Sequence, residues 1–570
     1  MKRFYSALLV ASLPAIGFAQ STAESVSAIF QANCTTACHS GGNPSANLDL
    51  SGTPSDLVDA LVDVDPFNPA AAAKGYKLID PGYPHNSFVL YKCAYEEWDD
   101  QFGMDPAEGN PMPDGGGQLE KEEIELIRQW ILYGAKPSGT DVSPQTLYDY
   151  YHVNGMARIE KPAPPAPGEG IQMHMGPFFL EPGEEVEFYK KEMLEENDEQ
   201  NVTKFEAFFN DDSHHFLLFE LDPAVAANED DGLRPVGFEN AFENPYIIGW
   251  VDPDVTELPN GTAYKINENA LIDLNYHIIN YASNGDSVQA AEAYVNLYTD
   301  NTSSDLIEME SDLLIYNYYN NVVPFIGPAA LSIINNGNEQ TFTEAIYNSN
   351  STDSLYIWFL SSHTHKYGTD YDIYKRNPDG SRGDQLYEGF YNTTYDFPQG
   401  SYDWEHPPNL YLDDFYGEMI AIAEKDGLIQ EAKYEINNPN EGAVVNFGLT
   451  TDDEMMLAFI QYTRERVPDQ QPQGIFDGEN KKSSIMSIYP NPTNGSSTIK
   501  FSLDESADVK LIVYNSLGQE VNSLYNGSMT AGPATFQFDA SAGLDPNGLY
   551  LIQLMVDGKV YTDRLLHFKR

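Results

Sequence analysis

Residues 355–365 read LYIWFLSSHTH, and this stretch combines a strand pattern with a pair of metal-binding side chains. Residues 355–360 are mostly aromatic or aliphatic types that favour an extended chain. His363 and His365 follow two residues apart, so on a strand both imidazoles point to the same face. The stretch therefore predicts a β-strand that ends in a site where two histidines can reach one metal ion.

The strand pattern extends over residues 171–466. Short runs rich in Val, Ile, Tyr and Phe alternate with turns of Asn, Asp, Gly and Pro, which is typical of all-β sandwiches. The length suits two packed sandwiches, which we place at residues 171–325 and 326–466, with a junction near 318–329.

Four further side chains in this region are candidate metal ligands. His214 and His215 are adjacent in SHHFLLFEL, His277 lies in LIDLNYHIINYA, and Met455 lies in TTDDEMMLAF. Imidazole and thioether are soft ligands that suit an ion cycling between Cu(I) and Cu(II). Adjacent residues on a regular strand point to opposite faces, so His214 and His215 need a local twist to share one ion.

The segments HHFLLFE, LNYH, HTHKYG and NFGLTTDDEMM resemble the copper type II, ascorbate-dependent monooxygenases, the family of peptidylglycine α-hydroxylating and dopamine β-monooxygenases. The resemblance runs from about residue 172 to about residue 465. It implies two coppers per chain and divides the ligands between them. His214, His215 and His277 would hold the electron-transfer copper. His363, His365 and Met455 would hold the catalytic copper, where O2 is activated.

This chain departs from the family at two points. The animal enzymes have several disulfides in this region, whereas here no cysteine follows Cys93. A tyrosine usually follows the third histidine of the family, whereas here Tyr276 precedes His277.

Residues 25–136 carry helical signals, among them EKEEIELIRQWILYG at 120–134. Cys34, Cys38 and His39 lie in QANCTTACHS, where two thiols can bond to haem and the histidine can ligate its iron. The spacing is C-x3-C-H, one residue longer than the usual C-x-x-C-H. With PGYPHNSFVLYK and NPMPDGG downstream, the segment resembles the cytochrome c-like domains of exported bacterial proteins. The resemblance implies haem c with Met112 as sixth ligand, or Met104 in its place.

The two ends of the chain point to export. Residues 1–20 have a positive start, an apolar stretch and a small-residue cleavage site, as in a secretory signal. No other run is long and apolar enough to span a bilayer, so we expect a soluble exported chain. Residues 484–570, with IYPNP, LIVYNSLGQEV and PNGLYLIQL, resemble the sorting domain of the type IX secretion system, a small Ig-like β-sandwich read by that machinery. Residues 137–170 and 467–483 are polar linkers rich in Pro or Gly.

The net charge of the chain limits the kinds of molecule that it can bind. The chain has 31 Lys and Arg against 87 Asp and Glu, a net charge of −56. Nucleic acid is excluded as a partner, because its phosphates need basic side chains. The acidic surface fits a secreted or outer-membrane surface protein.

The sequence thus predicts a multidomain fold: a small all-α cytochrome c-like domain, a mainly-β core of two jelly-roll-like sandwiches, and an Ig-like sandwich. The predicted function is a copper-dependent monooxygenase that hydroxylates a C–H bond of a small organic or peptide substrate with O2. Ascorbate or a redox protein would be the external electron donor, and the haem could relay the electrons. The alternative is a surface electron-transfer or copper-binding haemoprotein without monooxygenase activity. A third reading is an adhesive β protein with structural metals.

Overall fold

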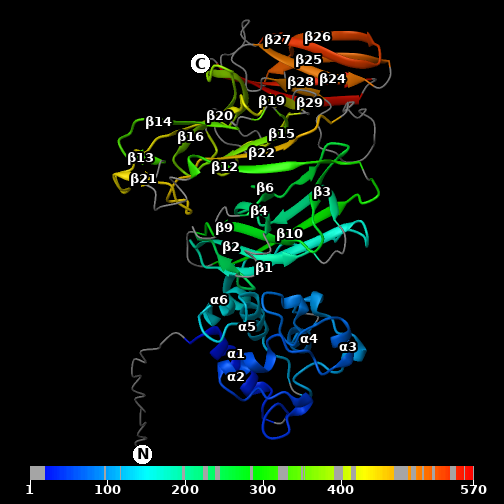
Figure 1. The fold of residues 1–570 in the computed structure, drawn as a ribbon, viewed down its shortest axis with the longest axis vertical. Coiled ribbons are helices and arrows are strands. Elements are labelled where there is room, and N and C mark those ends of the chain that lie inside the picture. Colours follow the sequence, from blue (N-terminus) through cyan, green and yellow to red (C-terminus); the bar gives the residue numbers. More distant parts are fainter. Residues whose placement is uncertain are drawn as a thin grey trace, which may run out of the picture.

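Figure 1 shows the computed structural model, in which a helical unit, two β-sandwiches and a terminal β unit follow one another along the chain. The structure describes residues 20–36, 38–95, 98–115, 117–194, 199–221, 229–237, 244–282, 287–303, 305–318, 331–347, 351, 353–389, 402–412, 419–467, 486–489, 496–503, 506–515, 520–539, 547–556 and 559–568. Nearly all of the predicted signal, residues 319–329 of the predicted junction and part of the IYPNP motif lie outside these residues. Within them, no helix is long and apolar enough to cross a membrane.

The N-terminal unit is helical. Its α-helices are α1 (Thr22–Asn33), α2 (Pro54–Leu61), α3 (Pro69–Ala73), α4 (Phe88–Cys93), α5 (Lys121–Leu132) and α6 (Pro144–Asp149). α5 occupies the segment whose apolar spacing predicted a helix, and Trp130 and Ile127 on it are fully buried. α6 lies inside the predicted linker at 137–170, and its Leu147 is buried in the same core as α1 and α5. The helical core therefore extends beyond residue 136.

The first sandwich packs two antiparallel sheets, with one parallel pair at an edge, around a shared core. Phe178, Phe205 and Ile272 are among the fully buried residues that both sheets contribute. One sheet has the order β1-β10-β3-β8-β11, with β7 paired to β3, and the other has the order β5-β2-β9-β4-β6. The strands are β1 (Gly170–Leu180), β2 (Glu185–Met193), β3 (Gln200–Phe209), β4 (Ser213–Leu221), β5 (Arg234–Pro235), β6 (Tyr246–Trp250), β7 (Val255–Glu257), β8 (Thr262–Ile266), β9 (Leu271–Ile279), β10 (Gln289–Thr299) and β11 (Ile307–Glu308).

The second sandwich packs the sheet β12-β22-β15-β18, with β19 paired to β15, against the sheet β14-β20-β16-β17. A short pair, β13-β21, completes it. β12 precedes the predicted boundary at 325/326 and yet pairs along its whole length with β22. The strands are β12 (Glu310–Ile315), β13 (Ser332–Ile334), β14 (Gln340–Ile346), β15 (Ser354–His363), β16 (Gly368–Arg376), β17 (Arg382–Glu388), β18 (Leu410–Tyr411), β19 (Ile420–Ala423), β20 (Leu428–Tyr434), β21 (Val444–Asn446) and β22 (Leu457–Thr463).

The two sandwiches contact each other through one sheet of each. Leu217 and Phe219 on β4 are buried against Phe459 on β22 and Leu313 on β12. Side chains on a strand alternate between faces, so the odd-numbered residues of β4 face the second sandwich while Phe216 and Leu218 fill the core of the first. This interface positions the candidate site described below.

Buried charges join the helical unit to the first sandwich. Arg158 bonds Asp99 of the helical unit at 3.0 Å and Glu292 of β10 at 2.7 Å. Arg128 on α5 also bonds Asp99, at 2.7 Å, and His174 on β1 bonds Glu292 at 2.8 Å. The carboxyl of Glu292 is fully buried, so it depends on these cationic partners.

The C-terminal unit consists of the sheets β23-β24-β27 and β26-β25-β28-β29. Buried side chains of both sheets, such as Ile499 and Leu511, share one core. The strands are β23 (Met486–Tyr489), β24 (Ser496–Leu503), β25 (Ala507–Asn515), β26 (Glu520–Met529), β27 (Gly532–Asp539), β28 (Asn547–Val556) and β29 (Lys559–Phe568). The described residues are thus mainly in β-strands, as predicted for the core, and their α-helices are short and lie in the N-terminal unit. Whether the helical unit is a cytochrome c domain stays a prediction.

Candidate metal centre

The interface between the two sandwiches gathers the predicted copper ligands in one place. β4 supplies His214 and His215, and β9 supplies His277. β15 ends at His363, and His365 follows two residues later. The ring centroids of His214 and His363, which come from different sandwiches, are 4.8 Å apart. The five imidazoles therefore form a single cluster rather than two separated pairs.

A β-bulge solves the geometric problem posed by the adjacent histidines. Ser213 pairs with Ile278 and His215 pairs with His277, so His214 is an extra residue on β4. A bulge bends the strand and re-aims the side chain of the inserted residue. As a result, the rings of His214 and His215 are 5.4 Å apart instead of on opposite faces.

Three side chains of the first sandwich form a row across neighbouring strands. His277 on β9 lies opposite His215 on β4 and opposite Glu187 on β2. Directly opposed residues on one face of a sheet have their Cβ atoms about 5 Å apart. His277, whose ligand role had the weakest sequence support, is only 2% exposed and sits at the centre of the row. Burial raises the pKa of Glu187.

His277 is oriented by a second glutamate. Its Nε2 lies 2.8 Å from Glu185, whose carboxylate also accepts hydrogen bonds from the backbone N–H and the hydroxyl of Thr451. Burial acts to raise the pKa of Glu185, but the hydrogen bonds from His277 and Thr451 outweigh it and lower the pKa to about 2. Thr451 belongs to the second sandwich, so this carboxylate also ties the two sandwiches together.

The second sandwich orients its histidines through the loop that carries Met455. The Nδ1 of His365 lies 3.2 Å from the carbonyl oxygen of Asp453, which leaves Nε2 free. The buried carboxylate of Glu454 accepts the backbone N–H of His365 at 3.0 Å and of Tyr367 at 2.6 Å. Partners of this kind fix the tautomer and direction of a metal-ligating histidine.

Several imidazole nitrogens in the cluster are buried and find no hydrogen-bond partner among the described residues. They are both nitrogens of His214, Nδ1 of His215 and Nε2 of His363. Burial, together with the neighbouring histidines, holds the pKa of these three side chains well below the usual histidine range and that of His365 at about 3. The rings are therefore neutral and present lone pairs. Buried nitrogens without partners are costly unless an ion takes the lone pairs, so these residues fit a bound metal.

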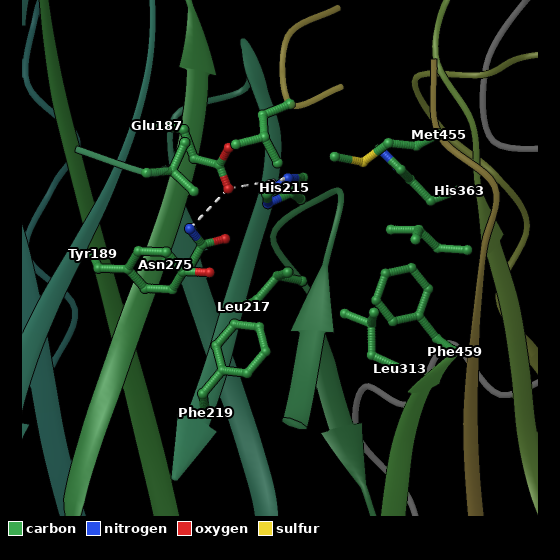
Figure 2. A pocket seen from close by; sticks show the side chains of 13 residues that line it. Glu187, Tyr189, His215, Leu217, Phe219, Asn275, Leu313, His363, Met455 and Phe459 are labelled. Atoms are coloured by element: carbon green, nitrogen blue, oxygen red, sulfur yellow. Dashed lines mark hydrogen bonds and ion pairs between the residues drawn. The ribbon is translucent and has the colours of Figure 1, made fainter. Parts of the chain in front are cut away.

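A small cavity of about 20 Å3 opens beside the cluster. His215, His363 and Met455 line it, and in Figure 2 the thioether of Met455 lies next to His363 and points toward His215. Leu217, Phe219, Leu313 and Phe459 make its lower wall apolar. A space of this size holds about one water molecule. It can admit a diatomic ligand but not an organic substrate.

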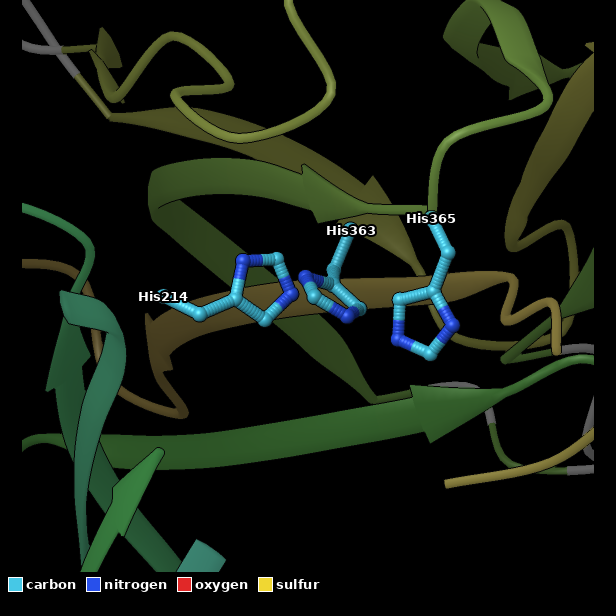
Figure 3. A group of neighbouring side chains, drawn as sticks. All are labelled: His214, His363 and His365. Atoms are coloured by element: carbon cyan, nitrogen blue, oxygen red, sulfur yellow. The ribbon is translucent and has the colours of Figure 1, made fainter. Parts of the chain in front are cut away.

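Within the cluster, the ligand atoms fall into two groups in which every atom lies within 4.8 Å of the others. One group is His214, His363 and His365, shown in Figure 3. The other is Glu187, His215 and His277. The division implied by the family resemblance, with His214 beside His215 and His277, stays a prediction.

The predicted haem ligands lie in the helical unit. Cys34 and Cys38 are free thiols, the first partly buried and the second exposed. His39 is buried, and its Nδ1 lies 3.2 Å from the carbonyl oxygen of Leu48, an arrangement that leaves Nε2 available to iron. Met112 is half-buried. The histidine therefore fits the role that the motif predicts for it.

Comparisons with known proteins identify one part of the chain. Residues 487–567 match the family described as "Secretion system C-terminal sorting domain". This supports the predicted type IX sorting domain, and with it export to a secreted or cell-surface location and contact with the secretion machinery. No curated protein sequence matches the chain.

Solved structures give only distant similarities. A Parabacteroides merdae β-glucuronidase is 12% identical over 40% of this chain and 28% of its own, with a TM-score of 0.12. A Ruminococcus gnavus β-glucuronidase in complex with uronic isofagomine is 10% identical over 67% of this chain and 44% of its own, with a TM-score of 0.12. The chain thus spans less than half the length of these enzymes, and scores this low carry no functional argument.

Sequence reasoning missed the carboxylates of the site. Glu185 and Glu187 lie in EVEFYKKEM, where alternating acidic residues look like an ordinary solvated strand face. Glu454 lies in the run TTDDEMM, of which only the methionine drew attention. Trp404, whose ring is 5.5 Å from that of His214, lies in a segment with no strand pattern. The alternation in EVEFYKKEM was the one usable signal.

Proposed function

We propose that the chain is a secreted copper-dependent monooxygenase that inserts one atom of O2 into a C–H bond of an organic or peptide substrate. The overall reaction takes the substrate, O2, two electrons and two protons to the hydroxylated product and water. The single observation that carries the proposal is the buried cluster of five histidines, three of which have ring nitrogens with no hydrogen-bond partner in the described part of the chain. Bound copper would supply one-electron redox chemistry and O2 activation there.

The chain's own residues would hold and shield the ions. The imidazoles of His214, His215, His363 and His365 stay neutral in their buried setting, as metal ligands must. Met455 adds a soft ligand at the cavity, which suits the reduced ion. The apolar side chains of Leu217 and Phe459 exclude bulk water from the cavity wall. Glu185 and the carbonyl of Asp453 hold His277 and His365 in the tautomers that point a lone pair inward.

For electron delivery we propose a haem c on Cys34, Cys38 and His39, with Met112 as sixth ligand. The support is the orientation of His39 and the docking of the helical unit through Arg158, Asp99 and Glu292. A carrier fixed to the core can pass electrons one at a time, with ascorbate or a redox protein as the external donor.

A second candidate is an electron-transfer or copper-binding protein without monooxygenase activity. The observation that favours it is the size of the cavity, about 20 Å3, which leaves no room for an organic substrate beside the histidines. The monooxygenase proposal therefore requires this cavity to widen during turnover.

The test combines metal content with oxygen uptake. Purified protein should hold about two coppers and, with a reductant and a panel of peptide and small organic substrates, consume one O2 for each hydroxylated product. The His363→Ala variant should lose that coupled uptake. Two coppers with no coupled uptake on any substrate would favour the second candidate, and absence of copper binding would refute both.

A further inference from the structure

We propose that His214 coordinates the same ion as His363 and His365, across the interface between the two sandwiches. Glu187 then replaces His214 as the third ligand of the ion bound by His215 and His277. The inference rests on the proposed function, because it assumes that the cluster binds metal. It assigns Glu187 a direct ligand role, and it makes one of the two sites span both sandwiches.

The position of Glu187 carries the first half of the argument. Its Oε1 lies 3.9 Å from Nε2 of His215, and its Oε2 lies 4.0 Å from Nδ1 of His277. These separations are too long for hydrogen bonds. Two ligands about 2.0 Å from a tetrahedral ion lie about 3.3 Å apart, so a small contraction brings all three side chains onto one ion. Asn275 donates a hydrogen bond to Glu187 at 2.9 Å and steadies its carboxylate (Figure 2).

The hydrogen bonds of His277 support the same site. Glu185 takes the Nε2–H of His277 at 2.8 Å, so the bare lone pair is on Nδ1, the nitrogen nearest Glu187. A carboxylate, a histidine and a metal in line are a recurring arrangement at metal centres. In this chain Glu185 would be the outer carboxylate, and Glu187 the ligand.

The bulge on β4 carries the second half. It turns His214 toward the second sandwich, where its ligand atom lies within 4.8 Å of those of His363 and His365 (Figure 3). Both nitrogens of His214 find no partner among the described residues, so either can coordinate. Together with Met455, this ion would have three imidazoles and a thioether.

The new division gives the two ions different surroundings. The site of Glu187, His215 and His277 contains a hard, charged oxygen ligand and favours Cu(II). The site of His214, His363, His365 and Met455 is neutral and soft and favours Cu(I). The family assignment and the proposed assignment both place three imidazoles on one ion and two on the other. Counting imidazoles per ion in the wild type therefore cannot distinguish the two assignments, and variants are needed.

The test starts from the His363→Ala/His365→Ala double variant, which should retain one Cu(II) under either division. Equilibrium dialysis against a competing chelator measures the Kd of this ion. Adding His214→Ala should change the Kd by less than about threefold, whereas adding Glu187→Gln should raise it about tenfold or more. Glu344→Gln, a partly buried glutamate on β14, is the matched control and should leave the Kd unchanged.

The reciprocal background, His215→Ala/His277→Ala, guards against a variant that fails to fold. There His214→Ala should raise the Kd of the remaining ion about a hundredfold, whereas Glu187→Gln should change it by less than about threefold. A Kd that rises about tenfold or more on adding His214→Ala to the first background overturns the proposal, as does a Kd that changes by less than about threefold on adding His214→Ala to the second. A wild type that binds two coppers but follows the family division overturns only this inference, whereas one that binds none overturns the proposed function.

Discussion

Replacing His214 by leucine should stabilise the metal-free protein, although it damages the site. His214 is 2% exposed, and neither of its ring nitrogens has a hydrogen-bond partner among the described residues. A buried polar atom without a partner costs about 1–3 kcal/mol. Leucine has a similar volume and no polar atom, but it fits an imidazole-shaped space imperfectly, which costs about 1–2 kcal/mol. Two such nitrogens together cost about 2–6 kcal/mol, so the net expectation is a gain of about 2 kcal/mol.

The assay is thermal unfolding in EDTA, followed by the fluorescence of buried tryptophans such as Trp250 in the first sandwich. For a unit of this size, 2 kcal/mol corresponds to a rise in Tm of about 4–8 °C. Copper should reverse the order. A hundredfold excess over Kd adds about 2.7 kcal/mol for each site, and the variant has lost one site.

His277→Leu is the matched control in the same cluster. His277 bonds Glu185 at 2.8 Å, so its removal loses a charge-assisted hydrogen bond of about 1.5–3 kcal/mol. The metal-free Tm should fall in this variant. If His214→Leu lowers the metal-free Tm as much as His277→Leu does, the nitrogens of His214 have partners in solution and the reasoning from unpartnered ligands fails.

Three further predictions concern other parts of the molecule. Glu454→Gln should weaken copper binding at His363 and His365 about tenfold. The carboxylate of Glu454 accepts two backbone N–H groups, and in the variant an amide N–H donor would face one of them. An unchanged copper Kd in a chelator competition would show that Glu454 does not position His365. Arg158→Met should remove one cationic partner of the buried Glu292 carboxylate and lower the free energy of unfolding by about 3–5 kcal/mol. The measurement is proteolysis of the segment between the helical unit and β1, which should become faster. Equal cleavage rates in the variant and the wild type would show that this ion pair does not hold the two units together. Burial raises the pKa of Asp141 to about 6. Its ionisation therefore costs stability as pH rises from about 4 to 6, so Asp141→Asn should raise the Tm at pH 8 and leave it unchanged at pH 3.5. A Tm gain equal at both pH values would rule that cause out.

Local patterns predicted the elements of this fold better than their pairing. The run of aromatic and aliphatic residues at 355–360 gives β15, and the acidic first turn and apolar spacing of residues 121–132 give α5. Both follow from contacts within a few residues. β12 pairs with β22, about 150 residues later, and nothing within Glu310–Ile315 indicates to which sandwich it belongs. Such long-range pairing depends on complementary faces that form only when both sheets exist.

The histidines could be found from the sequence because imidazoles are rare in this chain, with 11 in 570 residues. Glutamates could not, because they are common and usually solvated. Glu187 becomes a candidate ligand only through the register that sets it opposite His277, and that register is a property of two strands about 90 residues apart. The family resemblance could not supply it either, because the resemblance concerns the histidines and the methionine alone.

The bulge on β4 shows how one residue decides the site. In a regular strand, His214 would follow the even-numbered Phe216 and Leu218 into the apolar core of the first sandwich, where an unpartnered imidazole is costly. The extra residue between Ser213 and His215 moves it to the interface, where the imidazoles of His277 and His363 are its neighbours. On a regular strand, His214 and His215 would be a poor chelating pair. With the bulge, His215 is directed along its own sheet and His214 is directed across to the other sandwich. A site of this kind exists only while the sandwiches are in contact, so metal binding and closure of the interface should stabilise each other.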